Sequence, residues 1–241
     1  MTTVDATFPG SLRSTRERYG VGVLEGKNLS FRYGKRQEWI FQALDICIAP
    51  GERVGLPGPS GRGKSTLSKV LAGYLVPQEG IVTIDDHPKN DKRFNPVQRL
   101  FQHPELAVNP RWKIRDILKE TGTPSDEIMH TLQVDQSWLD RYPHELSGGE
   151  LQRICLVRAL DSRTKYLLCD EMTSMLDALT QASIWKAVLN IAEARNLGLL
   201  VISHDTSLLK RICERSLSYF EMACQESCIK SDLPTFNRQE N

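Results

Sequence analysis

The sequence predicts an α/β fold in which a parallel sheet carries helices on both faces. Three observations lead to this prediction. Strand-like apolar runs alternate with helix-like segments, which is typical of a parallel sheet covered by helices. A glycine-rich motif at residues 58–65 joins one apolar run to a helix. From residue 103 to about 160 helical patterns dominate, which indicates a mainly helical subdomain inserted into the α/β core.

The first elements of the predicted domain are strands. Residues 21–33 form a strand-like pattern, and in residues 40–48 the side chains of Leu44, Ile46 and Ile48 share one side. A turn at Pro50 follows. We expect these segments to form a small antiparallel β subdomain.

Strands and helices then alternate along the chain. The remaining predicted strands cover residues 53–56, 80–84, 97–101, 166–169 and 199–202. The predicted helices of the core cover residues 64–72 and 179–195, and those of the helical subdomain cover 114–120, 125–133 and 151–160. We expect one domain over residues 21–222, between a flexible tail at 1–20 and a short tail at 223–241.

Composition and charge exclude several classes of protein. Of the 241 residues 40% are hydrophobic and 25% are charged, which argues against wholesale disorder. The net charge of +1 gives little non-specific attraction to nucleic acid. The longest apolar run, residues 197–202, is far shorter than the roughly 20 residues of a membrane span. The first ten residues lack the features of a signal peptide, so we expect the chain in the cytoplasm.

The six cysteines do not indicate a metal site. Cys47, Cys155 and Cys169 lie in apolar patterns and are expected in the core. Cys213, Cys224 and Cys228 have no zinc-binding spacing.

Residues 58–65 match the phosphate-binding pattern G-x-x-x-x-G-K-[ST] in full. Its glycines let backbone N–H groups point at phosphate oxygens, and the following helix N-terminus adds partial positive charge. Lys64 is expected to reach the β and γ phosphates and the Ser65 hydroxyl to bind Mg²⁺. The alternative is an ordinary glycine-rich turn. The predicted ATP-binding residues here are Gly58, Pro59, Ser60, Gly61, Arg62, Gly63, Lys64, Ser65 and Thr66.

Two predicted strands end in polar groups. Asp170 and Glu171 follow the apolar run 166–169, where Asp170 is expected in the Mg²⁺ shell and Glu171 is expected to polarise the attacking water. His204 follows the run 199–202 and is placed to contact a γ-phosphate or to orient that water. The alternative readings are a solvated loop start for the acids and a surface or capping role for the histidine.

Residues 146–150, which we name the signature segment, contain an S-x-x-E capping box. Ser147 and Glu150 are placed to cap a helix whose apolar residues begin at Leu151. Gly148 and Gly149 leave the amides of this helix N-terminus open to a phosphate.

Taken together, these motifs resemble the ATP-binding subunits of ABC transporters over roughly residues 21–220. The resemblance rests on the phosphate loop 58–65, a glutamine loop at Gln102, the signature segment, Asp170-Glu171, a D-loop at 174–177 that ends in Asp177, and a switch histidine, His204. It implies ATP and Mg²⁺ as cofactors, with Ser65, Gln102 and Asp170 at the metal. It also implies that the signature segment contacts ATP held on the opposite subunit. The family usually has Gln where this chain has Glu150, which leaves the capping logic intact.

The resemblance also assigns an adenine-stacking aromatic and a coupling residue. Tyr33 resembles the aromatic that stacks on adenine, although a core aromatic of the β subdomain is the alternative, and Phe31 is the weaker candidate. Gln102 is expected to reach Mg²⁺ or water and to couple the two subdomains. A groove near Gln102 is where we expect a permease loop to dock.

Finer similarity points to the peptide/nickel importer ATPases. It rests on residues 101–104, 108–111, 142–147 and 170–177. Such systems imply a second ATPase subunit (a heterodimer, with a homodimer also open), two transmembrane permeases and an external substrate-binding protein, with the ATPase at the cytoplasmic face of the inner membrane. The chain lacks the C-terminal Arg-Cys-Pro extension of many members, which weakens the prediction of peptide as the cargo.

Two other functions compete with ATP-driven import. One is a non-transport ABC ATPase that acts on nucleic acid or ribosomes, against which the net charge of +1 and the single ATPase module argue. The other is a nucleotide-binding regulator that does not hydrolyse, against which Glu171 and His204 argue.

Overall fold

The computed structural model describes residues 22–84, 87–88, 94–122 and 124–217. The predicted tails at 1–20 and 223–241 lie outside the described residues, and so do Cys224 and Cys228.

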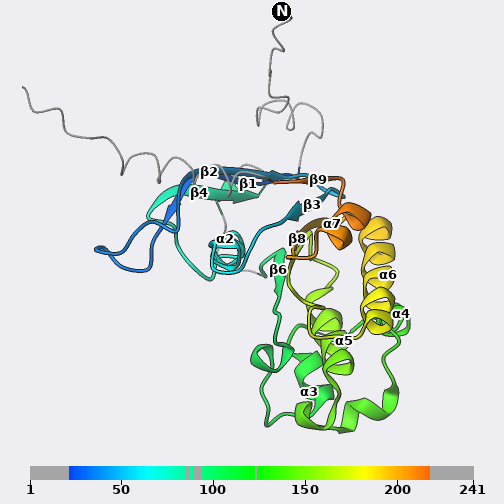
Figure 1. Cartoon of the computed structure of the whole chain (residues 1–241). Coiled ribbons are helices and arrows are strands. Elements are labelled where there is room, and N and C mark those ends of the chain that lie inside the picture. Colours follow the sequence, from blue (N-terminus) through cyan, green and yellow to red (C-terminus); the bar gives the residue numbers. More distant parts are fainter. Residues whose placement is uncertain (1–21, 85–86, 89–93, 123, 218–241) are drawn as a thin grey trace, which may run out of the picture.

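A small antiparallel sheet forms one end of the molecule (Figure 1). Its strand order is β2-β1-β4-β5, with every neighbouring pair antiparallel. Its strands are β1 (Leu24–Phe31), β2 (Phe41–Ile48), β4 (Glu79–Ile84) and β5 (His87–Pro88). The apolar side chains predicted to share one side of β2 are buried, since Leu44, Ile46 and Ile48 are each at most 2% exposed. The predicted antiparallel subdomain is confirmed.

The second sheet is parallel throughout, in the order β6-β7-β8-β3-β9. Its strands are β3 (Arg53–Leu56), β6 (Val97–Leu100), β7 (Tyr166–Asp170), β8 (Gly198–Ile202) and β9 (Arg215–Ser216). Every residue of β7 and β8 is buried, as expected for strands that are covered on both faces.

Alternate side chains of the central strands pack into two different hydrophobic clusters. Leu168 and Leu200 pack with Leu67 and Leu71 of helix α2 (Lys64–Leu71). Leu167 and Cys169 belong to the cluster on the other face, which contains the buried residues of α5 (Gly148–Ala159) and α6 (Ala178–Arg195). Helices therefore cover both faces of the parallel sheet, and the predicted α/β fold is confirmed. Helix α7 (Thr206–Ile212) also packs, through Leu209, against the cluster that contains residues of α5 and α6.

The helical end lies away from the antiparallel sheet (Figure 1). It contains α5, α3 (Ile114–Lys119), α4 (Asp126–Thr131) and the short 3₁₀ helices η1 (Pro104–Ala107), η2 (Gln136–Asp140) and η3 (Pro143–Glu145). Ile114, Ile117 and Leu132 are fully buried in the hydrophobic cluster that also contains the apolar residues of α5.

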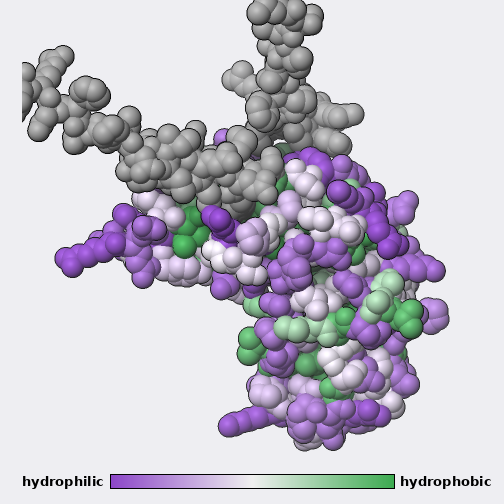
Figure 2. Space-filling view, in the orientation of Figure 1, coloured by the Kyte–Doolittle hydropathy of each residue, from purple (hydrophilic) through white to green (hydrophobic). Residues whose placement is uncertain are grey.

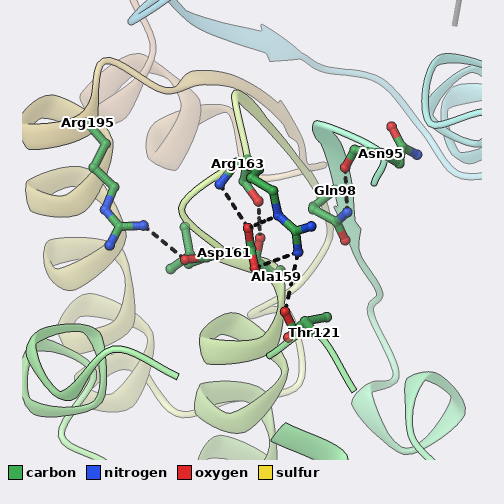
Figure 3. A network of polar contacts seen from close by, with 9 residues as sticks. Asn95, Gln98, Thr121, Ala159, Asp161, Arg163 and Arg195 are labelled. Atoms are coloured by element: carbon green, nitrogen blue, oxygen red, sulfur yellow. Dashed lines mark hydrogen bonds and ion pairs between the residues drawn. The ribbon is translucent and has the colours of Figure 1, made fainter. Parts of the chain in front are cut away.

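Polar contacts tie this helical end to the parallel sheet (Figure 3). The guanidinium of Arg163, in the connection between α5 and β7, donates to both carboxylate oxygens of Asp161 at 2.7 and 3.0 Å and to the Thr121 carbonyl at 3.4 Å. Arg195 of α6 donates to the Leu160 carbonyl at 2.9 Å. Residues of the helical subdomain are therefore bonded to segments that follow it in the chain.

The surface is mostly hydrophilic in the view of Figure 2, with hydrophobic residues gathered mainly over the helical end. Among the large hydrophobic side chains that remain exposed are Leu106, Trp112 and Met175. Within the described residues, no helix combines the length and apolar character needed to cross a membrane.

Candidate functional site

Four parallel strands deliver the predicted site residues to one edge of the sheet. The phosphate loop follows β3, Gln102 follows β6 and His204 follows β8. Asp170 is the last residue of β7, and Glu171 comes directly after it. Because these strands are parallel neighbours, their carboxyl ends meet at the same edge, which is where open α/β sheets bind ligands.

The phosphate loop has the backbone that its glycines permit. Gly58, Gly61 and Gly63 have φ angles of 128°, 82° and 81°, which disfavour any residue with a Cβ atom. Gly63 is also the N-cap of α2, and no side chain caps this helix. The N-terminus of α2 therefore keeps its N–H groups available for an anion.

Lys64 lies inside this loop. Its Nζ donates to the carbonyls of Gly58 and Pro59 at 2.7 and 2.6 Å, and the residue is 5% exposed. Burial lowers the pKa of the Lys64 ammonium, while the charges of Glu171 and Asp170 act in the opposite direction. The Lys64 ammonium is thus held inside the loop, where it can donate to phosphate oxygens.

Ser65 and Asp170 form a pair of hard oxygen donors. Ser65 Oγ donates to Asp170 Oδ1 at 3.0 Å, and Gln102 lines the same pocket. A hydroxyl, a carboxylate and an amide oxygen are the ligand types that suit Mg²⁺, so the residues present fit this ion. Asp170 is also paired on its other oxygen, because Arg99 Nη2 lies 2.5 Å from Asp170 Oδ2.

A pocket of about 320 Å³ connects the loop with these groups. We name it the nucleotide pocket; its lining residues are Tyr33, Ile40, Ser60, Gly61, Gly63, Lys64, Ser65, Thr66, Gln102 and Glu171. Gly58, Pro59 and Arg62 of the predicted set are not among them.

Tyr33 lies at the open end of the nucleotide pocket. It is 57% exposed, and its Oη lies 3.1 Å from Thr66 Oγ1. Phe31 is only 4% exposed and meets the Tyr33 ring edge-on at 5.1 Å. The structure thus leaves the Tyr33 ring accessible to an adenine base and places Phe31 in the core.

Glu171 is held in an unusual backbone conformation. Its φ is 48°, in the left-handed region, and its N–H donates to the Ile202 carbonyl of β8 at 3.0 Å. His204 Nδ1 lies 3.5 Å from Glu171 Oε1. A positive φ at a residue other than glycine costs about 1–3 kcal/mol and persists only where the surroundings enforce it.

Gln102 links the pocket to the segment after Glu171. Its Nε2 donates to Ser174 Oγ at 3.2 Å, and this hydroxyl donates to the Glu171 carbonyl at 3.0 Å. Gln102 is therefore connected through Ser174 to the backbone of Glu171.

The signature segment lines a different pocket. Ser147 Oγ accepts from the Glu150 N–H at 3.3 Å and Glu150 Oε2 accepts from the Ser147 N–H at 2.7 Å, so the predicted capping box is present. The pocket, about 500 Å³, is lined by Ser147, Gly148, Gly149, Glu150 and Asp177, among others, and by no residue of the phosphate loop. We name it the signature pocket.

Gly149 and Asp177 lie where α5 packs against the start of α6. A Cβ atom on Gly149 would lie 2.8 Å from Thr180 Cγ2, so α5 packs closely on the start of α6. Asp177 Oδ1 accepts from the N–H groups of Thr180 and Leu179, and these bonds lower the pKa of the Asp177 carboxyl. Asp177 therefore caps the N-terminus of α6.

The sequence analysis missed three residues of this site. Ile40 lines the nucleotide pocket, although it was predicted to begin a strand that starts at Phe41. Ser174 joins Gln102 to Glu171. Arg99 pairs with Asp170, and the only available signal was a charged residue within the otherwise apolar run 97–101.

The sequence is similar to those of known ABC transporter proteins. The family model described as "ABC transporter" matches residues 41–174. The nickel import system ATP-binding protein NikE of Staphylococcus aureus strain bovine RF122 / ET3-1 is 35% identical over 210 residues, covering 80% of this chain and 84% of the relative. The same protein from strain MSSA476 matches equally well.

Solved structures with similar folds include two of MJ0796, a bacterial ABC transporter cassette. The dimeric cassette has a TM-score of 0.69 and 24% identity over 80% of this chain and 93% of the other. A dimeric post-hydrolysis state bound to ADP and Pi has a TM-score of 0.68 and 25% identity, with the same coverage. CbiO1 of Clostridium perfringens, part of the ABC transporter complex cbiONQ, has a TM-score of 0.68 and 19% identity over 88% of this chain and 94% of the other.

Proposed function

The chain belongs to the ABC transporter family of ATP-binding subunits and is an ATPase, and we propose that it powers an importer for peptides, nickel or metal chelates. The observation that carries this proposal is the arrangement of Lys64, Ser65, Gln102 and Glu171 around one pocket, with Asp170 bonded to Ser65.

The charges of the nucleotide pocket suit hydrolysis of a phosphoanhydride. Lys64 and the N–H groups at the start of α2 neutralise the phosphates, and Tyr33 stacks on the adenine base. Ser65, Gln102 and Asp170 would hold Mg²⁺, which would neutralise further phosphate charge. Glu171 Oε1 accepts the proton of the attacking water, and His204 at 3.5 Å orients Glu171 and that water.

The separate signature pocket supports a complex with a second ATPase subunit. Ser147 and the two glycines present the N-terminus of α5 to solvent, and this chain has no phosphate loop residue in that pocket. In our proposal the γ-phosphate of an ATP held by the partner ATPase lies there. The partner is either a second copy or a related chain.

A groove beside Gln102 is the proposed docking site for a permease loop. It is about 440 Å³ and lies between Gln102, Pro143, Leu151 and Met172, among others. Gln152 also lines it, and both side-chain polar atoms of Gln152 are buried without a hydrogen-bond partner among the described residues. A short, largely apolar loop fits this lining. Such docking on two permeases would place the chain at the cytoplasmic face of the membrane.

The cargo assignment rests on the similarity to the importer branch. The S. aureus relatives are named as nickel import proteins, and the cargo contacts of such systems lie on the permeases and an external binding protein. Peptides and metal chelates therefore remain part of the proposal.

Gene deletion with complementation tests the function. We expect deletion to reduce uptake of labelled Ni²⁺, a Ni²⁺ chelate or an oligopeptide, and we expect the wild-type gene but not Glu171→Gln to restore it. Unchanged uptake of all three cargos would contradict the importer assignment. Co-sedimentation with ribosomes would instead favour the non-transport alternative.

A further inference from the structure

Arg99 is a buried cation that none of the ATPase motifs includes. It lies on β6, is 8% exposed, and faces the same side of the sheet as α2, because its Nε donates to Ser68 Oγ at 2.8 Å. Its guanidinium carbon also lies 4.3 Å from the centre of the Phe101 ring. Contacts with Ser68 of α2, with Phe101 directly after β6 and with Asp170 of β7 fix this side chain.

The strongest of these contacts is to Asp170. Arg99 Nη2 lies 2.5 Å from Asp170 Oδ2, and Ser65 occupies Asp170 Oδ1 at 3.0 Å. The side chains of the pair are 5% and 7% exposed, so solvent screens their attraction very little. One carboxylate oxygen of Asp170 therefore pairs with the permanently charged Arg99, and the other accepts from the Ser65 hydroxyl.

The pairing balances the charge of the site without a metal ion. Lys64 and Arg99 carry two positive charges, and Asp170 and Glu171 carry two negative charges. A Mg²⁺ ion bound to Asp170 would lie close to the Arg99 guanidinium, which pairs with the same carboxylate. Like charges at such distances repel each other substantially where solvent is excluded. Without Arg99 the same site would have a net charge of −1 and would attract Mg²⁺ more strongly.

We propose that Arg99 is a positioning residue that holds Asp170 as a paired carboxylate and thereby weakens Mg²⁺ binding until ATP supplies its own negative charge. The inference rests on the proposed role of Asp170 at the metal. Arg99 Nη1, which is buried without a hydrogen-bond partner among the described residues, agrees with a cation retained for its charge rather than for a complete set of hydrogen bonds.

The test compares Arg99→Met with Arg99→Lys and Arg153→Met in the full chain. Arg99→Lys keeps the charge. Arg153 is a second buried arginine, but it donates to the Leu132 carbonyl and Ser183 Oγ and has no carboxylate partner among the residues that the structure describes. Its loss therefore controls for the removal of a buried guanidinium. Two readouts are used: the Mg²⁺ concentration that half-saturates binding of a fluorescent ATP analogue, and the melting temperature with Mg²⁺ alone.

For Arg99→Met we expect the half-saturating Mg²⁺ concentration to fall about fivefold or more. We expect 10 mM Mg²⁺ without nucleotide to raise its melting temperature by about 2–4 °C and that of the wild type by less than about 1 °C. Arg99→Lys should resemble the wild type, and Arg153→Met should lose stability with no response to Mg²⁺.

The inference would be overturned if Arg99→Met melted at a lower temperature but its half-saturating Mg²⁺ concentration stayed within about twofold of the wild type. Arg99 would then have only a structural role. Asp170→Asn separates this outcome from a wrong metal site. If Asp170 serves the metal, Asp170→Asn raises the Mg²⁺ requirement whatever Arg99 does. If Asp170→Asn leaves it unchanged, the metal assignment itself fails.

Discussion

His204 Nδ1 lies 3.5 Å from Glu171 Oε1, and the two residues come from adjacent strands of the parallel sheet. Glu171 follows β7 and His204 follows β8, and the Glu171 N–H donates to the last residue of β8. The backbone bond sets the positive φ of Glu171, and the carboxylate then faces both the histidine and the nucleotide pocket. One strand pair thus brings together the proposed general base and the residue proposed to orient it.

The first prediction concerns this carboxylate. Glu171→Gln keeps the size of the side chain and removes the proton acceptor, so ATP binding should persist while turnover falls by about 10²- to 10⁴-fold. Steady-state phosphate release in the assembled complex measures the effect. Glu193→Gln, an exposed position on α6, is the matched control. Turnover of Glu171→Gln within threefold of wild type would remove Glu171 from the mechanism.

The second prediction concerns Lys64. Lys64→Ala removes the ammonium that now bonds the Gly58 and Pro59 carbonyls, and the phosphates would then face backbone dipoles alone. We expect loss of hydrolysis and weaker ATP affinity by calorimetry. Lys69→Ala, in the last turn of the same helix, should bind ATP as the wild type does. Retained affinity and activity in Lys64→Ala would show that the phosphate loop is wrongly assigned.

The third prediction concerns the ring of Tyr33. Stacking of a base on an aromatic side chain contributes about 1–3 kcal/mol, so Tyr33→Ala should weaken ATP binding by roughly 5- to 150-fold. Tyr33→Phe loses only the hydrogen bond to Thr66 and should stay within about threefold, because a neutral hydrogen bond contributes little net stability.

Tyr74→Ala is the control for this prediction, since Tyr74 is 60% exposed but does not line the nucleotide pocket. The measurement is a fluorescence titration with an ATP analogue. If Tyr33→Ala binds the analogue as tightly as Tyr74→Ala does, the ring of Tyr33 does not stack on the base.

The elements that the sequence predicted well are those with a strong apolar pattern. The run 166–170 and the run 198–202 are buried along their whole length, and a continuous apolar run is a local signal. Strand β9 and helix α7 were not predicted. Strand β9 has only two residues, and it is defined by its pairing with β3. Pairing between residues so distant in sequence leaves no local pattern.

The same distinction applies to the site. The phosphate loop and the capping box of Ser147 are local motifs, and the structure has the backbone and hydrogen bonds that both require. Arg99 became part of the site only through contact with Asp170, 71 positions later in the chain. A buried arginine in an apolar strand could be noted from the sequence, but its partner could not be identified.

The fourth prediction concerns the signature pocket and the partner subunit. Ser147→Arg places a bulky cation at the N-terminus of α5, where the proposed γ-phosphate of the partner's ATP lies. In mixed complexes with the partner ATPase, photolabelling with an ATP analogue should show damage at the partner's nucleotide site. The label at this chain's own Lys64 should persist, because no residue of the signature segment lines the nucleotide pocket.

Ser125→Arg controls for the introduction of an arginine at a helix start. Ser125 is the exposed N-cap of α4 in the same helical end, and its side chain makes no capping bond. It should leave both nucleotide sites labelled. Loss of label at this chain alone in Ser147→Arg, with the partner's site intact, would show that Ser147 serves the nucleotide of its own chain. A head-to-tail pair of ATPase subunits requires the opposite result, since each ATP must then lie between the phosphate loop of one subunit and the signature segment of the other.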